Sequence, residues 1–293
     1  MLNALTIDLE EWFCSHNLQA AVQPQDWDHL PWRAAPPTLR LLEILERRGV
    51  RATFFVLGWL AERQPALVQA VQAAGHEIAS HGYAHRLTWQ HSAASFREDL
   101  RRAQSAIQEA TGVTPVLFRA PAFSITRRCL WAPDVLAEAG FVADSSVFPL
   151  SWHPEYGVPQ AGLVPFRHAN GLIELPMSVV EAAGKRFPVS GGAYFRLLPY
   201  PVYRALVRHL HRQGRPLLFY LHPWELDDAM PPLRGLSASA RFRHYTNTHT
   251  VAHKLERFVN EFDFAPLGRV YADTLYQQPT MYRYEAPDSA PQL

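Results

Sequence analysis

Short apolar runs and longer stretches of helical periodicity alternate along most of the chain. The apolar runs predict strands at residues 5–9, 52–57, 76–80, 116–118, 141–143, 173–180 and 217–221. Between them apolar residues recur every three or four positions, often up to a glycine, and predict helices at about 37–49, 67–75, 96–112, 129–139, 202–210 and 251–262. Because strand and helix alternate, the pattern predicts βα units and a parallel sheet.

About six or seven such units, without the glycine pattern of a dinucleotide- or phosphate-binding loop, favour a closed or nearly closed α/β barrel. An open doubly wound sheet is the alternative. The 293 residues are 48% hydrophobic and 19% charged, which supplies one sizeable core, so we expect a single domain over residues 1–293. Residues 279–293 are rich in proline and are expected to form a loose tail.

The formal net charge of +1 and the lack of a long basic tract argue against a nucleic-acid partner. Cys14 and Cys129 are the two cysteines and stand far apart, which favours a reducing compartment over a disulfide framework. The first residues lack the basic and apolar regions of a signal peptide, and no apolar run is long enough for a membrane span. We therefore expect a soluble protein in the cytoplasm.

Polar or ionisable residues follow five of the predicted strands. They are Asp8 with Glu10, His81 with His85, Arg119, Asp144 and His222. In a parallel α/β barrel the chemistry collects at the C-terminal ends of the strands, so these residues are predicted to form one site. Each could cap a turn or lie on the surface by itself, but the combination indicates a catalytic centre.

His81 and His85 indicate half of a metal site. Two imidazoles four residues apart lie on one face of a helical turn, or close together on a tight loop, and both can reach one ion. Gly82 stands between them where zinc proteases carry the glutamate that acts as general base. The base must therefore come from elsewhere in the chain.

The whole set of residues fits metal-assisted hydrolysis of an amide. Two histidines and one carboxylate bind Zn²⁺ and leave a position for water, whose pKa the metal lowers while it polarises a carbonyl. A second carboxylate accepts the proton of the water, and a distant histidine, kept protonated by an aspartate, donates one to the leaving amine. Arg119 would orient the base carboxylate and keep it ionised.

In order and rough spacing, these residues resemble the five motifs of the NodB-like polysaccharide deacetylases, carbohydrate esterase family 4. The resemblance spans roughly residues 4–225 and rests on Asp8, the His81/His85 pair, Arg119-Ala120-Pro121, Asp144 and Leu221-His222. It implies a distorted (β/α)7 barrel that removes acetyl groups from N-acetylated sugars. The roles it implies are Asp8 as base, His81 and His85 as metal ligands, Arg119 orienting the base, His222 as general acid supported by Asp144, and the backbone N–H of Ala122 as oxyanion donor.

Four further segments look like the branch of that family encoded with bacterial exopolysaccharide and exosortase systems. They are residues 6–11, 188–192, 222–226 and 242–245. The segment from about 226 to 278 looks like an extension specific to that branch and is expected to pack on the barrel. Ala122 departs from the family pattern, which usually has an aromatic residue there, and Phe123 follows one place later. A backbone donor survives such a change.

The third metal ligand is open between Glu10 and Glu11, because the sequence has Asp8-Leu9-Glu10-Glu11 where the family usually has adjacent aspartates. Side chains alternate across a strand, so Asp8 and Glu10 point to one side and Glu11 to the other. We therefore predict Glu10 as the ligand. Glu11 would take this role if the chain turned one residue later.

Aromatic residues near the motifs are predicted to bind a sugar through their flat faces. They are Trp12, Trp89, Phe123, Trp152 and Trp224. Core packing is the alternative for any single tryptophan, because its large surface buries well wherever it lies.

These features predict a metal-dependent hydrolase that removes N-acetyl groups from an N-acetylhexosamine-containing polysaccharide or its lipid-linked precursor, working with an exopolysaccharide biosynthesis machinery. The expected metal is Zn²⁺, or another divalent transition ion such as Co²⁺ or Ni²⁺. The alternatives are a hydrolase of small amides on the same scaffold and a catalytically silent glycan-binding module. Asp8 and His222 argue against the module, because binding a sugar needs neither a base nor an acid.

Overall fold

The computed structural model describes residues 1–151, 156–182 and 184–276, and within them one curled sheet of nine strands organises the molecule. The strands follow the order β10-β1-β2-β3-β4-β5-β7-β6. In addition, β11 pairs with Asn3 and Ala4 at the start of β1. All neighbours run parallel except β6 and β7. A separate antiparallel hairpin consists of β8 and β9.

The strands are β1 (Asn3–Leu9), β2 (Thr53–Val56), β3 (Glu77–Ser80), β4 (Leu117–Phe118), β5 (Ala143–Asp144), β6 (Phe166–Arg167), β7 (Ile173–Glu174), β8 (Val179–Ala182), β9 (Lys185–Pro188), β10 (Leu218–Leu221) and β11 (Phe264–Ala265). The helices are α1 (Ala35–Glu46), α2 (Gly58–Arg63), α3 (Pro65–Ala73), α4 (Ala93–Thr111), α5 (Ala132–Glu138), α6 (Gly192–Leu197), α7 (Tyr200–Arg212), α8 (Ala238–Tyr245), α9 (Val251–Glu261), α10 (Leu267–Val270) and α11 (Ala272–Tyr276). None of the helices in the described ranges is long and apolar enough to cross a bilayer.

The prediction of a distorted α/β barrel is confirmed. The strand order advances in one direction from β1 to β5, whereas a doubly wound sheet reverses its direction at a switch point. Next to β10 the barrel wall continues through a segment without regular strand pairing, where the backbone N–H of Tyr220 donates to the carbonyl of Ser190 at 2.8 Å. The predicted strand at 173–180 is divided into β7 and β8 around Pro176, because proline has no N–H to donate to a strand ladder.

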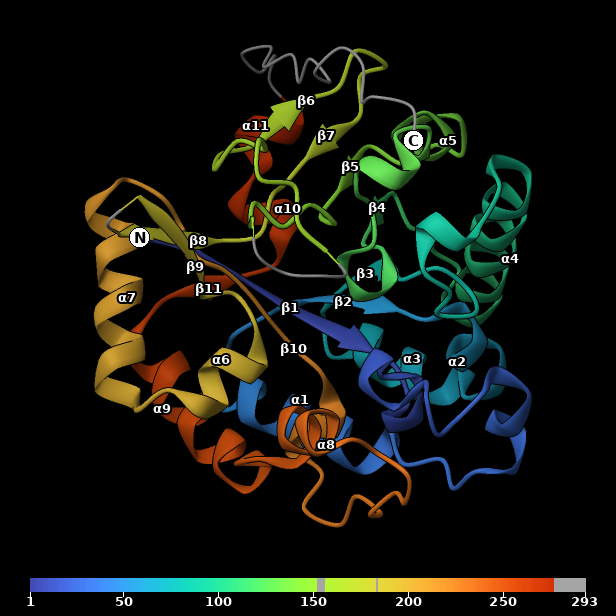
Figure 1. Cartoon of the computed structure of the whole chain (residues 1–293), viewed down its shortest axis with the longest axis horizontal. Helices are drawn as coiled ribbons and strands as arrows, with labels where there is room; N and C mark the ends of the chain where they lie inside the picture. The colour runs from blue at the N-terminus through green and yellow to red at the C-terminus, as the bar shows by residue number, and fades with distance from the viewer. Residues whose placement is uncertain (152–155, 183, 277–293) are drawn as a thin grey trace.

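The helices lie around the outside of the curled sheet, with α4 on one side and α7 and α9 on the other (Figure 1). All seven residues of β1 are buried, because this strand has neighbours on both sides and helices against it. α4 places Phe96, Leu100 and Ile107 on its buried face at helical spacing. This helix begins after the Ser92 cap and ends at Gly112, whose φ of 73° is a left-handed conformation suited to glycine.

The segment from residue 226 to 276 contributes α8, α9, β11, α10 and α11. β11 pairs with β1, and Phe258 of α9 packs its ring 5.3 Å from that of Phe219 in β10. The association of this segment with one branch of a family stays a prediction. The tail expected at 279–293 lies outside the described residues.

Candidate active site

The predicted site residues meet at the C-terminal ends of neighbouring strands. Asp8 is the penultimate residue of β1 and Glu10 follows that strand, while His81, Arg119 and His222 come directly after β3, β4 and β10. Except for the buried Arg119, they line one cavity of about 370 Å³, together with His85, Ala122, Phe123 and Trp224. The candidate catalytic and metal-binding residues therefore lie at the end of the barrel that the sequence predicts.

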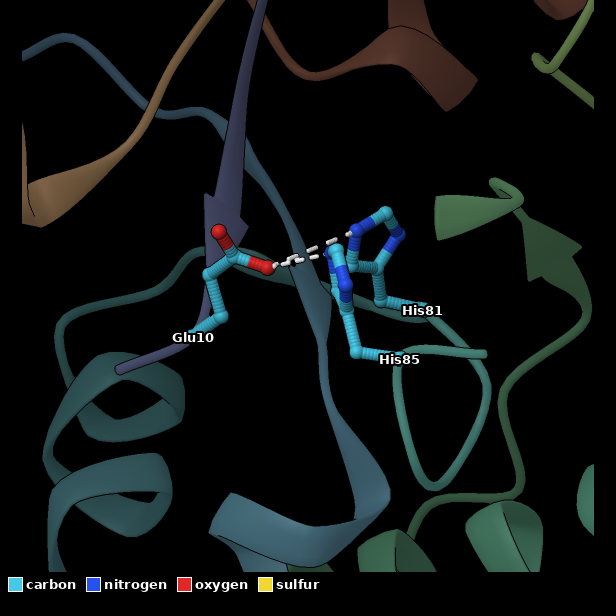
Figure 2. A group of neighbouring side chains, drawn as sticks. All are labelled: Glu10, His81 and His85. Carbon is cyan, nitrogen blue, oxygen red and sulfur yellow. Dashed lines mark ion pairs between the residues drawn. The ribbon is translucent and has the colours of Figure 1, made fainter. Parts of the chain in front are cut away.

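Glu10, His81 and His85 form a buried cluster in the lining of this cavity. Figure 2 shows both imidazoles facing the carboxylate, with Glu10 Oε2 at 2.7 Å from His85 Nε2 and 4.0 Å from His81 Nε2. One ligand atom from each of the three lies within 4.8 Å of the others. Two imidazoles and one carboxylate are the donor set of catalytic zinc sites with an open position.

The protein fixes the orientation and charge state that a metal ligand needs at His81. Its Nδ1–H donates to the carbonyl of Arg119 at 2.8 Å, which leaves the lone pair of Nε2 directed at Glu10. Burial lowers the pKa of His81 to about 4, so the imidazole is neutral near pH 7. Burial opposes ionisation of Glu10, but the neighbouring His85, His222 and His81 outweigh it and lower the pKa of Glu10 to about 2.

The residues present fit a bound divalent metal. Glu10 Oε2 is buried and, among the described residues, has no hydrogen-bond partner of good geometry, although it lies next to His85. A buried carboxylate oxygen without such a partner is costly unless a cation compensates it. Glu10, His81 and His85 would therefore hold the ion.

The loop that carries both histidines is held from outside by Asp99 of α4, which the sequence analysis missed. The carboxylate of Asp99 accepts hydrogen bonds from the backbone N–H groups of Tyr83 at 2.8 Å and Ala84 at 3.3 Å. Gly82 has a φ of 72°, and a Cβ at this position would lie 3.0 Å from Asp99 Oδ2. The tight turn and the capping carboxylate together bring His85 back toward His81.

Glu11 has a structural role. Its carboxylate accepts hydrogen bonds from the backbone N–H groups of Arg33 at 2.7 Å and Ala34 at 3.1 Å, and from Gln64 Nε2 at 2.7 Å. It therefore points away from the histidines, as alternation along an extended strand requires. The structure brings Glu10, and not Glu11, to the cluster.

Asp8 pairs with Arg119 inside the barrel. Arg119 Nη1 donates to Asp8 Oδ1 at 2.7 Å and to Thr6 Oγ1 at 2.8 Å, and its Nε donates to the carbonyl of Ser145 at 3.2 Å. Both side chains of the pair are buried, and the guanidinium lies 4.1 Å from the centre of the Phe55 ring. A buried carboxylate held in this way is fixed in one orientation.

The predicted support of His222 by Asp144 is wrong, because the partner of His222 is Glu225. His222 Nδ1 donates to Glu225 Oε1 at 3.1 Å, while its Nε2 faces Asp8 Oδ2 and Glu10 Oε1, each at 3.9 Å. Burial by itself would lower the pKa of His222, but the Glu225 hydrogen bond and the charges of Glu10, Glu225 and Asp8 raise it above its ordinary value. The side chain keeps 19% of its surface exposed toward the cavity.

Glu225 is fixed in turn by Arg196 of α6. Arg196 Nε donates to Glu225 Oε2 at 2.7 Å, and both side chains are buried. Arg196 also donates to the carbonyls of Arg243 at 2.8 Å and Thr246 at 2.6 Å. The sequence signal for Glu225 was its place three residues after His222, a spacing typical of a capping box.

Asp144 lies next to Glu174 and takes no part in the cavity surface. It accepts a hydrogen bond from Ser146 Oγ, and that hydroxyl accepts the N–H of Ala120 at 2.7 Å. Burial raises the pKa of Asp144 to about 6 and raises that of Glu174 well above its ordinary value. Through Ser146, Asp144 therefore supports the backbone directly after Arg119, while Glu174 accepts from the backbone N–H of Val147 at 2.9 Å.

Ala122 and Phe123 also line the cavity and have left-handed backbones with φ of 51° and 54°. Such conformations are uncommon outside glycine and are held by surrounding structure, often at functional sites. Phe123 packs against Tyr220, with ring centres 4.8 Å apart. The oxyanion role of the Ala122 N–H stays a prediction.

The predicted sugar-binding aromatics separate into three groups. Phe123 and Trp224 line the cavity. The prediction that Trp224 offers a flat face to a sugar is wrong, because its ring lies stacked between those of His222 at 4.8 Å and His244 at 4.5 Å. The prediction for Trp12 is wrong, because Trp12 is buried in the core. Trp89 is half-buried outside the cavity lining, and Arg128 lies over one face of its ring at 3.8 Å. Trp152 lies outside the described residues.

Two family models match the chain one after the other. Residues 27–142 match the polysaccharide deacetylase family, and residues 145–272 match a domain of unknown function, DUF3473. The second match contains His222, Glu225, Arg196 and Arg243.

Curated relatives share about 34% identity with part of the chain. A peptidoglycan deacetylase-like protein FGM2 of Gibberella zeae is 34% identical over 110 residues, which are 37% of this chain and 32% of that protein. A chitooligosaccharide deacetylase of Bradyrhizobium sp. is 34% identical over 117 residues, which are 38% of this chain and 51% of that protein. The chain thus spans a third to a half of the length of these relatives.

A solved structure from Mycobacterium smegmatis, described as a polysaccharide deacetylase, has a similar fold over nearly the whole chain. The TM-score is 0.68 at 24% identity, and the match covers 98% of this chain and 94% of that one. The similarity includes the C-terminal segment and supports the barrel as a shared fold.

Proposed function

Because the chain belongs to the polysaccharide deacetylase family, we propose that it hydrolyses N-acetyl groups on an N-acetylhexosamine-containing polysaccharide or its lipid-linked precursor. The observation that carries the proposal is the position of two firmly held ionisable groups beside the metal cluster. Asp8, paired with Arg119, and His222, paired with Glu225, face the same point of one cavity. A glycan-binding module would need neither pair.

A divalent metal held by Glu10, His81 and His85 would polarise the acetyl carbonyl and activate a water molecule. Zn²⁺ suits two imidazoles and a carboxylate, and Co²⁺ or Ni²⁺ can take the same ligands. His81 is neutral at pH 7 because burial lowers its pKa to about 4. This state favours ligation, because only an unprotonated imidazole nitrogen binds a metal.

Asp8 is the base in this proposal. Its Oδ1 accepts a hydrogen bond from Arg119, which leaves Oδ2 toward the cavity to accept the proton of the attacking water. His222 is the acid, since Glu225 holds Nδ1–H and directs the Nε2 proton into the cavity, where the leaving nitrogen would take it. Proton acceptor and proton donor then act on the same acetamide.

The finer parts of the proposal rest on sequence alone. A role in exopolysaccharide biosynthesis is supported by the resemblance of residues 188–192 and 242–245 to one branch of the family. A cytoplasmic location is a further part of the proposal. Both are independent of the chemistry at Asp8 and His222.

Acetate release from N-acetylhexosamine oligomers, measured together with the metal content of the same sample, tests the function. We expect a chelator to abolish acetate release and Zn²⁺ or Co²⁺ to restore it. Full activity of a sample that elemental analysis shows to be metal-free would contradict the mechanism. Hydrolysis of small amides without any release from oligomers would move the assignment to a small-amide hydrolase, and glycan binding without hydrolysis would move it to a binding module.

Glu225→Gln is expected to move the alkaline limb of the pH–rate profile to lower pH. The substitution keeps the size of the side chain and leaves one amide oxygen, which can accept from Arg196 or from His222 but not from both. It also removes a negative charge that raises the pKa of His222. The acid then loses its proton at a lower pH. Asp144→Asn is the matched control and should leave that limb in place, because Asp144 does not contact His222. If only Asp144→Asn moved the alkaline limb, Asp144 and not Glu225 would be the residue that supports His222.

A further inference from the structure

The wall of the cavity farthest along the chain comes from the segment that follows the metal-binding half. This segment contributes Tyr194 and Leu197 of α6 and Arg243 of α8. Next to Arg243 the cavity is lined by Asn17, from the N-terminal 3₁₀ helix His16–Leu18 against which α8 packs. We propose that Arg243 forms an anion subsite for an oxyanion group, a carboxylate or a phosphate, carried by the substrate beside the sugar that is deacetylated. This inference rests on the proposed function, and it adds that the glycan substrate carries a negative charge.

Arg243 is held in place at both its backbone and its side chain. Its carbonyl accepts a hydrogen bond from the buried Arg196 Nη2 at 2.8 Å, which fixes the last turn of α8 at the cavity. Its Nε donates to Asn17 Oδ1 at 3.1 Å. Since Nε is used in this way, the N–H groups of the two terminal nitrogens remain for a ligand.

The charges around the cavity single out Arg243. Asp8 pairs with Arg119 at 2.7 Å, Glu225 pairs with Arg196 at 2.7 Å, and Glu10 lies 2.7 Å from His85. Arg243 is the exception, because no carboxylate in the described residues forms an ion pair with it. It is therefore a cavity-lining cation whose charge is compensated only by solvent.

The shape of the Arg243 guanidinium indicates which kind of ligand would neutralise its charge when substrate binds. A guanidinium presents two parallel N–H donors that match the two oxygens of a carboxylate or phosphate. In an N-acetylated glycan such a group is either the carboxylate of a uronic-acid or lactyl-bearing sugar, or the pyrophosphate of a lipid-linked precursor. A neutral homopolymer such as chitin would leave Arg243 without a partner. The site thus favours an acidic glycan or a phosphate-linked one.

Binding of three probes to the zinc-loaded Asp8→Asn chain tests the subsite without turnover. The probes are a neutral N-acetylglucosamine tetramer, an oligomer of equal length that alternates N-acetylglucosamine with glucuronate, and N-acetylglucosamine linked through pyrophosphate to a short alcohol. Adding Arg243→Ala should raise the dissociation constant of one anionic probe roughly tenfold or more at low salt, and that of the neutral tetramer less than twofold. The probe that responds identifies the source of the oxyanion.

Arg241→Ala is the matched control, because Arg241 is exposed on the same helix but does not line the cavity. It should leave all three dissociation constants unchanged, and Arg243→Lys should recover only part of the lost affinity. Equal dissociation constants for neutral and anionic probes, or an equal effect of Arg243→Ala on all three, would overturn the subsite. Acetate release by the wild-type chain from the neutral tetramer is measured separately, so a failed subsite and a failed deacetylase assignment give different results.

Discussion

Asp8→Asn and His222→Ala are each expected to lower kcat for acetate release by roughly two to four orders of magnitude, with the metal still bound. Asparagine fills the volume of Asp8 and can still accept a hydrogen bond from Arg119, but it cannot take a proton. Alanine at 222 removes the Nε2 proton, which His222 directs into the cavity beside Asp8 while Glu225 accepts the Nδ1–H. Neither residue belongs to the cluster of Glu10, His81 and His85.

Zinc content of each purified variant separates a lost proton transfer from a lost ligand. Wild-type occupancy with a collapsed kcat supports the assigned roles, whereas a metal-free Asp8→Asn or His222→Ala protein would make that residue a ligand. His249→Ala and Asp228→Asn serve as controls, because both residues are exposed. The buried Arg119 loses its charged partner in Asp8→Asn, so the folded state of that variant should be checked by its unfolding transition.

The position of the site could be predicted because it depends on local pattern and topology. Asp8, His81, Arg119 and His222 each follow an apolar run, and parallel strands bring such positions to one end of a barrel. Glu10 could be preferred over Glu11 for the same reason, since β1 stays extended to Leu9 and alternates its side chains.

The partner of His222 could not be predicted from order along the chain. Asp144 stands at the end of β5, where its neighbour in register is Glu174 of the parallel strand β7. Residues in register share a face of the sheet, so the two carboxylates meet each other instead of the histidine. The support comes from Glu225 and Arg196, and the second of these precedes His222 by a whole helix and strand.

The tryptophans show a limit of composition as evidence for a sugar site. Trp12 follows the first motif as closely as Trp224 follows the last, yet its indole N–H donates to the carbonyl of Pro31 inside the core. Its ring packs 5.6 Å from Phe13, within an aromatic group that includes Trp27 and Trp59. An aromatic residue next to a motif satisfies core packing and sugar stacking equally well until its surroundings are known.

Glu10→Gln is expected to abolish most zinc binding, while Glu11→Gln should retain it. Glu10 supplies the carboxylate oxygen that lies within reach of both imidazoles, and a neutral amide is a poorer zinc ligand. The loss of affinity should exceed the roughly ten- to hundredfold typical of residues that only support a ligand. Glu11 lies among the N–H groups of Arg33 and Ala34, so its substitution should cost stability of about 1–3 kcal/mol instead.

Thermal unfolding with and without zinc distinguishes the two effects in one experiment. A ligand that binds the folded state at 100 times its dissociation constant stabilises it by about 2.7 kcal/mol, so the wild-type Tm should rise with added zinc. Glu11→Gln should start from a lower Tm and show the same rise, and Glu10→Gln should start near the wild-type value for the metal-free protein and show almost none. The opposite pattern would assign the ligand to Glu11 and require β1 to turn before residue 10 when the metal binds.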